Sequence, residues 1–279
     1  MITRLNTTRG MTVTRNDPNK PFLNRVHFGG SNKGSSIVKS NKILLALQFW
    51  NGDKAQAMAL ADLIADIEPG MCELADFLFV SRFDCQHDDH MIQKVSRKFS
   101  TLHHTSPRRG TGWPMGCNDL TAGMLEFVFH RMSAGKIPQY KAIFALEADV
   151  VPLNRDWIKL MSHNWDLLQS KNPVYVAGRK LKSAHIHEHI NGNALISGNF
   201  RFLRWLLREL NSNSAVGWDY RLAGEFARWG WAEIPGMECH WGTQTMSDAQ
   251  LLSECERGVI FLHGVKDFSA LNFARNRLL

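Results

Sequence analysis

Residues 141–149 read Lys-Ala-Ile-Phe-Ala-Leu-Glu-Ala-Asp, an apolar run that leads directly into Glu147 and Asp149. A continuous apolar run is typical of a strand that is buried on both faces of a parallel sheet. Side chains alternate along a strand, so both carboxylates are expected on the same side. Paired carboxylates are ligands for a hard cation such as Mg²⁺ or Mn²⁺. The alternative is an N-terminal cap for a helix that begins near Asp156.

Working outward from this strand, apolar and helical segments alternate through the first half of the chain. Strands are predicted at 43–50 and 76–80, with a short one near 99–102 in an otherwise polar and Gly-rich region, 85–117. Helices are predicted from an Asp53 cap to residue 67, and from Asn118 or Asp119 to residue 134. Parallel strands need crossover helices, so we expect an α/β fold with a mostly parallel central sheet flanked by helices.

The second half of the chain is less regular. Its predicted strands are 174–178, 192–197 and 258–262, and its predicted helices are 199–210 and 218–229. We divide the chain into a basic arm at 1–40 and one Rossmann-like domain at 41–279. That domain has a nucleotide-binding half at about 41–150 and an acceptor half at about 151–279.

Polar side chains follow the predicted strands. Asn51 and Asp53 come after the first, Arg82 and Asp84 after the second, and Glu147 to Asp149 after the strand quoted above. Ligands bind beyond the carboxyl ends of the strands in an open parallel sheet. The sequence therefore predicts a site at this edge.

A second motif lies near the C-terminus, where the apolar run 259–262 leads into His263, Gly264 and Lys266. A neutral imidazole could supply a nitrogen ligand to the same cation, and Lys266 could neutralise a phosphate. The alternative is a histidine at a strand end followed by a surface lysine.

Composition narrows the class of protein. A chain of 279 residues with 44% hydrophobic and 21% charged residues is not wholly disordered. No apolar stretch is long enough to span a membrane, and no apolar leader segment is visible. The five cysteines are widely spaced without a CxxC pair, which argues against a disulfide framework or zinc ribbon and favours a reducing cytoplasm.

The formal net charge is +7, and residues 1–40 carry seven cations and one acid. Such a segment suits a polyanion, although a solvated tail is the alternative. Helix 199–210 places Arg201, Arg204 and Arg208 opposite an apolar face, which suits either phosphate contact or solvent. Further cations that we expect near nucleic acid are Arg97, Lys98, Arg108 and Arg109.

A competing metal site is the alternating segment His185-Ile-His187-Glu-His189. Three imidazoles on one face of an extended segment could bind zinc, with Cys239 or His240 as a fourth ligand. The other interpretation is a polar loop that borders an acceptor pocket.

Taken together, Glu147-Ala148-Asp149 and His263-Gly-Val-Lys266 resemble motifs of the nucleotide-sugar transferases of the GT-A fold. In that family an acid-x-acid motif ends a central strand and holds Mn²⁺ or Mg²⁺ on the donor diphosphate. The resemblance implies that Asp149, Glu147 and His263 are metal ligands, with Glu147 standing where the family usually has Asp. It also implies that Lys266 binds phosphate.

The resemblance implies roles for further residues. Those assigned to the nucleotide sugar, which is expected to be a UDP-sugar, are Phe49, Trp50, Asn51, Asp53, Arg82, Asp84, Gly112, Asn118, Ala148 and Lys266. Those assigned to the sugar or acceptor pocket are His189, Asn191, Gly192, Asn193 and Trp218. Asp219 matches the acid that deprotonates the acceptor hydroxyl in inverting members, with a helix cap as its alternative role.

The segment from Glu147 to Trp157 and the His263 motif are also similar to compact phage-encoded GT-A proteins that glycosylate modified DNA bases. This similarity implies hexosyl or pentosyl transfer to a hydroxymethylated pyrimidine in phage DNA, in the host cytoplasm. Two alternatives stay open: a GT-A enzyme that acts on a glycan, protein or small molecule, and a non-catalytic nucleic-acid-binding protein. We expect no membrane partner.

Overall fold

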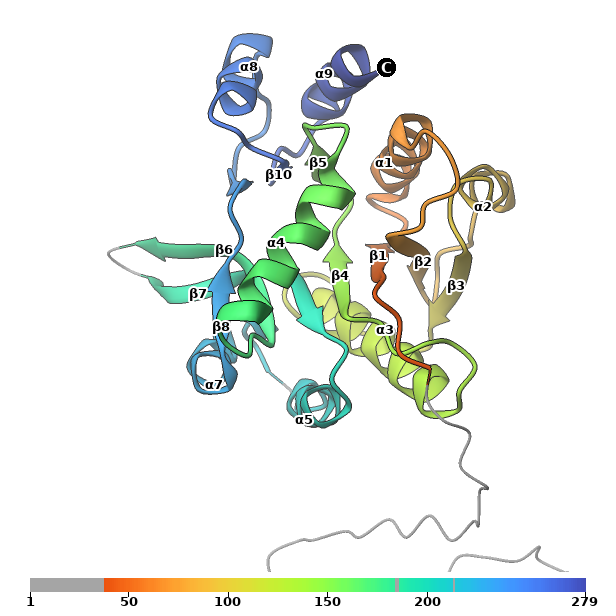
Figure 1. Cartoon of the computed structure of the whole chain (residues 1–279), viewed down its shortest axis with the longest axis vertical. Helices are drawn as coiled ribbons and strands as arrows, with labels where there is room; N and C mark the ends of the chain where they lie inside the picture. Colours follow the sequence, from red (N-terminus) through yellow and green to blue (C-terminus); the bar gives the residue numbers. More distant parts are fainter. Residues whose placement is uncertain (1–37, 184–185, 213) are drawn as a thin grey trace, which may run out of the picture. The chain divides into compact units, whose positions relative to one another are not determined.

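The computed structural model describes residues 38–183, 186–212 and 214–279. These residues belong to a compact unit that spans Ser36–Leu279 (Figure 1). The strands are β1 Ile43–Phe49, β2 Ala75–Arg82, β3 Thr101–Ser106, β4 Ala142–Leu146, β5 Val150–Pro152, β6 Val176–Ser183, β7 Ile186–Ser197, β8 Trp231–Glu233, β9 Met237–Cys239 and β10 Phe261–His263. The helices are α1 Lys54–Ile67, α2 Asp89–Ser96, α3 Met115–Ser133, α4 Trp157–Lys171, α5 Phe200–Leu210, α6 Trp218–Arg221, α7 Ala223–Trp229, α8 Asp248–Glu256 and α9 Ser269–Leu278.

The central sheet has seven strands in the order β3-β2-β1-β4-β7-β6-β8. The neighbours β3, β2, β1 and β4 are parallel, whereas β7 runs antiparallel to both β4 and β6. The predicted α/β class with a mostly parallel central sheet flanked by helices is therefore confirmed. Because β7 is reversed, its residues 191–193 lie beside the carboxyl end of β4, where the site is expected.

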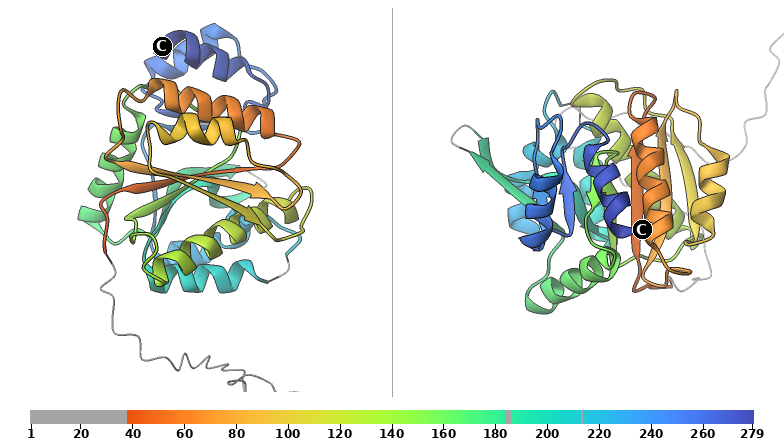
Figure 2. Two further views of the ribbon diagram at one scale, coloured as in Figure 1. Left: turned by 90° about the vertical axis from the view of Figure 1, so that its right-hand side faces the viewer. Right: turned by 90° about the horizontal axis from the view of Figure 1, so that it is seen from above.

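Helices cover both faces of this sheet (Figure 2). Side chains of β1 alternate between the faces: Leu45 and Leu47 pack in the core with α1, and Leu44 and Ala46 pack in the core with α3. The strand is fully buried along its whole length, as its apolar run predicts. The α1 core also includes α4, and the α3 core also includes α5.

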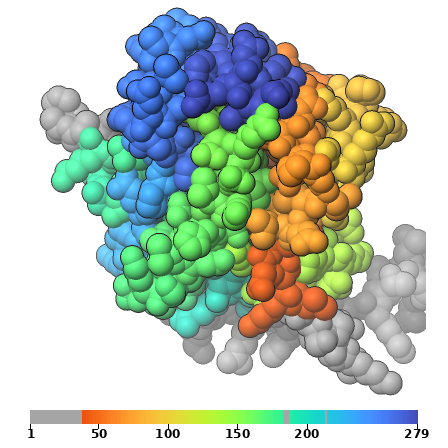
Figure 3. All heavy atoms as spheres, turned by 45° about the horizontal axis from the view of Figure 1, so that its top comes forward, coloured from red at the N-terminus to blue at the C-terminus, as the bar shows by residue number. Residues whose placement is uncertain are grey.

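A second, three-stranded sheet in the order β5-β10-β9 lies next to the central sheet. The C-terminal α9 follows it and packs beside α1 (Figure 3). Arg275 of α9 pairs there with Asp62 of α1. Phe261 of β10 packs edge-on against Phe144 of β4, with ring centroids 5.2 Å apart. The C-terminal segment is thereby fixed against the strand that leads into Glu147 and Asp149.

The helix predicted from Asp53 to residue 67 is confirmed as α1, whereas other details of the first half of the chain differ from prediction. Asp53 makes no capping hydrogen bond to α1, and its carboxylate instead accepts from the Trp50 backbone N–H at 2.8 Å. The helix predicted from Asn118 or Asp119 begins at Met115, because both side chains bind loops rather than the helix end. The region 85–117 contains α2, capped by the Asp88 side chain, and a six-residue β3.

The second half also departs from prediction. Strands 174–178 and 192–197 extend into the longer β6 and β7, whose outer ends are polar. Helix 218–229 is interrupted at Leu222, giving α6 and α7. Strand 258–262 is shifted to β10 and joins the second sheet. The predicted helix 199–210 is confirmed as α5, with the Asn199 side chain accepting from the Phe202 N–H.

Among the described residues, no helix has the length and apolar character that crossing a membrane requires.

Candidate active site

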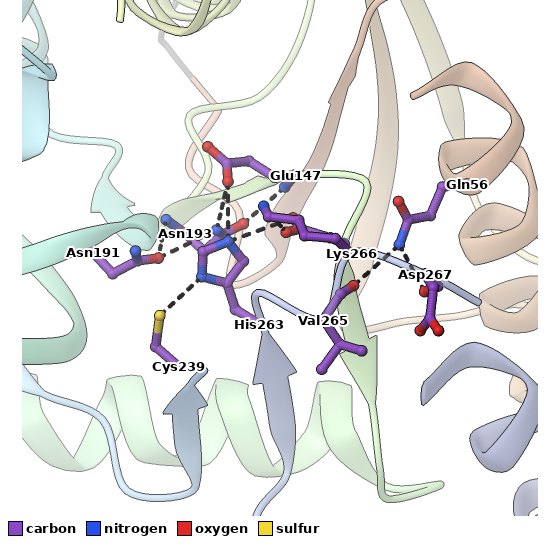
Figure 4. Close-up of polar contacts among 10 residues, drawn as sticks. Gln56, Glu147, Asn191, Asn193, Cys239, His263, Val265, Lys266 and Asp267 are labelled. Carbon is purple, nitrogen blue, oxygen red and sulfur yellow. Dashed lines mark hydrogen bonds and ion pairs between the residues drawn. The ribbon is translucent and has the colours of Figure 1, made fainter. Parts of the chain in front are cut away.

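Glu147, Asp149 and His263 converge at the carboxyl end of β4, although His263 is far away in the sequence (Figure 4). His263 Nε2 lies 3.1 Å from Glu147 Oε2 and 3.4 Å from Asp149 Oδ1. One ligand atom from each residue falls within 4.8 Å of the others. Within the described part of the chain, no other group of three or more His, Cys, Asp or Glu side chains gathers in this way.

The second sheet explains how the distant histidine reaches the carboxylates. In β10, His263 pairs with Val150 of the antiparallel β5 and with Cys239 of the parallel β9. Since β5 follows Asp149 directly, this register aligns the end of β10 with the acid-x-acid motif. Gly264 comes next with φ +101°, a conformation that favours glycine, and the chain turns there against the backbone of His240.

Neighbouring polar groups orient these three side chains. Cys239 Sγ lies 3.2 Å from His263 Nδ1, on the opposite side of the ring from the carboxylates. Asn193 accepts the Glu147 backbone N–H at 2.8 Å and donates to Glu147 Oε2 at 3.1 Å. Partners of this kind fix the tautomer and orientation of a metal ligand.

Charge pairing shifts the pKa values in this cluster. Burial alone would raise the pKa of Asp149, but hydrogen bonds and charge from His263 and Lys266 lower it overall. Burial opposes protonation of His263, yet contacts with Asp149, Cys239 and Glu147 raise its pKa well above the ordinary value. The pKa of Lys266 is also raised, because attraction to the Asp149 carboxylate exceeds the effect of burial.

The cluster lies in a cavity of about 390 Å³. The predicted site residues that line it are Trp50, Asp53, Arg82, Gly112, Asn118, Glu147, Ala148, Asp149, Asn191, Gly192, Trp218, Asp219, His263 and Lys266. The other lining residues are Gln48, Gln56, Trp113, Gly116, Cys117, Leu120, Thr121, Gly217 and Trp241. Gln48 and Thr121 are polar residues in apolar surroundings and hydrogen-bond to each other at 3.2 Å, a signal that could have been noticed. For Trp241 the sequence carries no such signal.

Asp219 enters the cavity from α6. Its pKa is raised, chiefly because desolvation disfavours the charged form, and the Glu147 charge adds to this effect. The helix-cap alternative is wrong, since Gly217 occupies the cap position of α6. Asn118 holds the preceding loop: it accepts from the Trp218 N–H at 2.9 Å and donates to the Val216 carbonyl at 3.1 Å. The Asn118 side-chain amide therefore makes its hydrogen bonds within the protein, to the loop before α6.

Elsewhere in the lining of the cavity, Arg82 is fixed by both carboxylate oxygens of Asp84 and lies 4.9 Å from the centre of the Trp50 ring. Asp53 lies nearby with a pKa raised to about 6, mainly by burial and then by the charges of Asp149 and Glu147. Arg82, Trp50 and Asp53 together offer a cation, an aromatic face for stacking and a carboxyl group for hydrogen bonding.

Five predicted ligand-contacting residues do not line the cavity. Phe49 is fully buried in the core, and Asn51 donates to the Asp84 carbonyl at 2.7 Å. Asp84 instead orients Arg82, and Asn193 orients Glu147. His189 is buried, and its Nδ1 lies 3.1 Å from the His187 carbonyl. Asp84 and Asn193 thus support neighbours that do reach the cavity.

The four cations of the 97–109 segment are not gathered at one face. Arg97 and Lys98 precede β3, whereas Arg108 and Arg109 follow its six residues, a separation of roughly 17 Å at ~3.3 Å per residue. Lys98 donates to the Glu68 carbonyl, and Arg108 is paired with Glu126 and Asp119. Arg109 is exposed and lies over the ring of Phe83.

The zinc alternative gains no support from the described residues. His187 contacts the Tyr220 carbonyl, and His240 pairs with Glu254. Cys239 contacts His263 instead of His187 or His189. The side chain of His185 lies outside the described residues.

The donor set of the cluster fits a hard divalent cation better than zinc in a structural site. Two carboxylates supply oxygen ligands, and His263 directs its Nε2 toward them while Nδ1 faces Cys239. Oxygen-rich sets of this kind suit Mg²⁺ or Mn²⁺.

No protein-family model matches this chain, and no curated protein matches it. Solved structures with similar folds include a glycosyltransferase involved in the glycosylation of the major capsid of PBCV-1, with 10% identity, TM-score 0.48, 85% of this chain and 98% of that one covered. Mouse xyloside xylosyltransferase 1 shows 10% identity and TM-score 0.44 over 80% and 97% of the chains. The glycosyltransferase GlyE of Streptococcus pneumoniae TIGR4 shows 9% identity and TM-score 0.45 over 82% and 55%. At TM-scores below 0.5, these similarities carry no functional argument.

Proposed function

We propose that this chain is a GT-A-type, divalent-metal-dependent glycosyltransferase that uses a nucleotide sugar, with UDP-sugars as the donor class. The convergence of Glu147, Asp149 and His263 in one cavity carries the proposal. A cation held by these residues would neutralise charge on the diphosphate leaving group. Lys266 pairs with the Asp149 carboxylate and adds a positive point charge beside the cluster.

The donor's nucleoside is assigned to the part of the cavity that is lined by Trp50, Asp53 and Arg82. The Trp50 ring and the Arg82 guanidinium offer stacking faces to a base, and Arg82 is held rigidly by Asp84. Asp53 can accept a hydrogen bond from a base or ribose. The sugar then lies between the cluster and Asp219, because both line the same cavity.

Asp219 is the candidate general base. As the bond from the anomeric carbon to the diphosphate oxygen breaks, its electron pair leaves with the diphosphate. An acceptor oxygen bonds to that carbon, and the Asp219 carboxylate takes the hydroxyl proton. A raised pKa makes this carboxylate a stronger base than an exposed aspartate. The role applies to an inverting reaction.

For the acceptor, we propose a hydroxymethylated pyrimidine in DNA that receives a hexosyl or pentosyl group. The formal net charge of +7 supports an anionic partner. Arg201, Arg204 and Arg208 of α5 support it further, since all three are exposed while the opposite face of the helix is buried.

The donor proposal is tested by thermal-shift measurements with UDP- and GDP-sugars, each with and without Mn²⁺. We expect a rise in melting temperature with one nucleotide class that depends on the metal, since a ligand that binds only the folded state stabilises it. If no nucleotide sugar shifts the transition in either condition, the donor site is wrong.

Asp149→Ala should abolish both Mn²⁺-dependent UDP binding and turnover, because it removes a buried ligand and leaves Lys266 without its partner. Asp248→Ala, which removes a carboxylate from the first turn of α8, is the matched control and should bind UDP normally. Unchanged UDP binding in Asp149→Ala would exclude the proposed metal cluster.

The acceptor proposal is tested by transfer of radiolabelled sugar from the donor identified above to hydroxymethylated DNA. Incorporation that is absent from unmodified DNA is expected. A protein that binds UDP and Mn²⁺ but labels no DNA would instead act on a glycan, protein or small molecule.

A further inference from the structure

Exposed tryptophans are concentrated at the candidate active site. Trp50, Trp113 and Trp241 expose 43%, 74% and 72% of their surface, and all three line the same cavity. In the described part of the chain, no other tryptophan is similarly exposed. Large apolar side chains gathered at the mouth of a cavity mark a surface that a ligand covers.

Two of these tryptophans flank the groups assigned to the chemistry. A side chain added at Gly217 would meet Asp219 at 2.8 Å and the Trp113 ring at 4.0 Å, so Gly217 separates this ring from the candidate base. On the other side, a side chain at Gly264 would meet the Trp241 backbone N at 2.9 Å, so the Trp241 loop rests on the residue after His263.

Exposed cations accompany these aromatic side chains. Arg109 lies 5.2 Å from the centre of the half-exposed Phe83 ring. Arg108 donates to Asn211, which ties this segment to the C-terminal end of α5 and its exposed arginines. We call Phe83, Arg109, Trp113 and Trp241 the aromatic rim.

We propose that the aromatic rim binds the acceptor DNA as a strand whose target base has left its stack, with Trp113 and Trp241 contacting that base and Arg109 a neighbouring phosphate. This inference rests on the DNA acceptor of the proposed function. Cations interleaved with exposed aromatic faces are typical of surfaces that bind single strands. A base within a duplex could not place its face on either tryptophan, so the rim requires an unstacked nucleotide.

The test measures fluorescence anisotropy of labelled oligonucleotides that contain hydroxymethylcytosine, as a single strand, a matched duplex and a duplex mismatched at the target. We expect the single strand and the mismatched duplex to bind more tightly than the matched duplex. Trp113→Ala should weaken single-strand binding roughly 5- to 150-fold, the range of stacking contributions, and Trp113→Phe should retain most of it. Leu252→Ala, which removes an exposed apolar side chain from α8, should bind like the unchanged protein.

UDP binding, measured on the same variants, separates this inference from the proposed function. Suppose that sugar is transferred to DNA but Trp113→Ala and Trp241→Ala bind oligonucleotides normally. The proposed role of the aromatic rim is then wrong, and the proposed glycosyltransferase function is retained. Preference for the matched duplex also overturns the rim. If the unchanged protein binds UDP but no oligonucleotide, the proposal that DNA is the acceptor is wrong. Binding of maltoheptaose that Trp113→Ala abolishes would then identify a glycan surface.

Discussion

At the scale of single residues, the candidate metal ligands depend on neighbouring side chains that fix their orientation. His263 directs one ring nitrogen to two carboxylates because the other faces Cys239. Glu147 is held by an Asn193 side chain that is 1% exposed. The sequence suggested Cys239 only as a possible zinc ligand and Asn193 only as a residue of the sugar pocket, so neither supporting role was predicted.

We predict that Cys239→Ala weakens Mn²⁺ binding roughly tenfold or more, as expected when a group that orients a metal ligand is lost. Cys239→Ser keeps a hydrogen-bonding atom near Nδ1 and should lose less. Isothermal titration with Mn²⁺ measures both, and Cys255→Ala on α8 serves as the control. Equal affinity of the alanine variant and the unchanged protein would show that Cys239 does not position His263.

A second prediction concerns Asp53, whose pKa is raised to about 6 from an ordinary value of 3.8. A raised carboxyl pKa means that ionisation costs stability, and this cost grows as the pH rises from the unfolded to the folded pKa. Asp53→Asn should therefore stabilise the protein by about 3 kcal/mol at pH values well above 6, where the cost is complete. Urea unfolding at pH 7.5 and pH 4 should show the gain shrinking at the lower pH. A gain that is independent of pH would contradict this account.

At the scale of elements, the small sheet β5-β10-β9 joins the two motifs that the sequence separates. β5 continues from Asp149 and β10 delivers His263, so their antiparallel register sets the geometry of the cluster. The turn after β10 requires Gly264, whose positive φ and close contact with His240 leave no room for a side chain.

Gly264→Ala should therefore destabilise the protein by more than the ~1–3 kcal/mol expected of backbone strain alone and should reduce Mn²⁺-dependent UDP binding. Gly258→Ala is a matched control, because its φ is also positive at +80° but no atom lies within 4 Å of the added carbon. Thermal unfolding and UDP titration distinguish them. Equal losses in both variants would mean that the contact with His240 is unimportant.

At the scale of the whole molecule, positive charge is unevenly distributed along the chain. Residues 1–35 carry six cations and one acid, or +5 of the total +7, and this part of the predicted basic arm lies outside the described residues. Lys39 already forms a β-bridge with Gln139 of the folded unit, so a truncation that spares the fold should end before residue 38.

Deleting residues 1–35 should weaken DNA binding at low salt and reduce its dependence on salt concentration, because fewer phosphate contacts release fewer counterions. Hydrolysis of the nucleotide sugar should change little. Anisotropy across a salt series and a donor-hydrolysis assay measure the two effects. Parallel loss of both activities would show that the segment is needed by the donor site.

The sequence by itself determined the α/β class, the buried parallel strands and the carboxylates at the end of β4, since these follow from local apolar patterning and alternation. It also pointed to Asp149, His263 and Lys266 as candidates. Only the tertiary structure decided that Asp149, His263 and Lys266 lie together and that Trp241 reaches the cavity. It also decided that Asn118 and Asp84 hydrogen-bond to the neighbouring residues Trp218 and Arg82. The physical reason is that pairing between β5, β10 and β9, together with the reversed β7, joins segments distant in the chain, and such contacts leave no periodic signal in either segment.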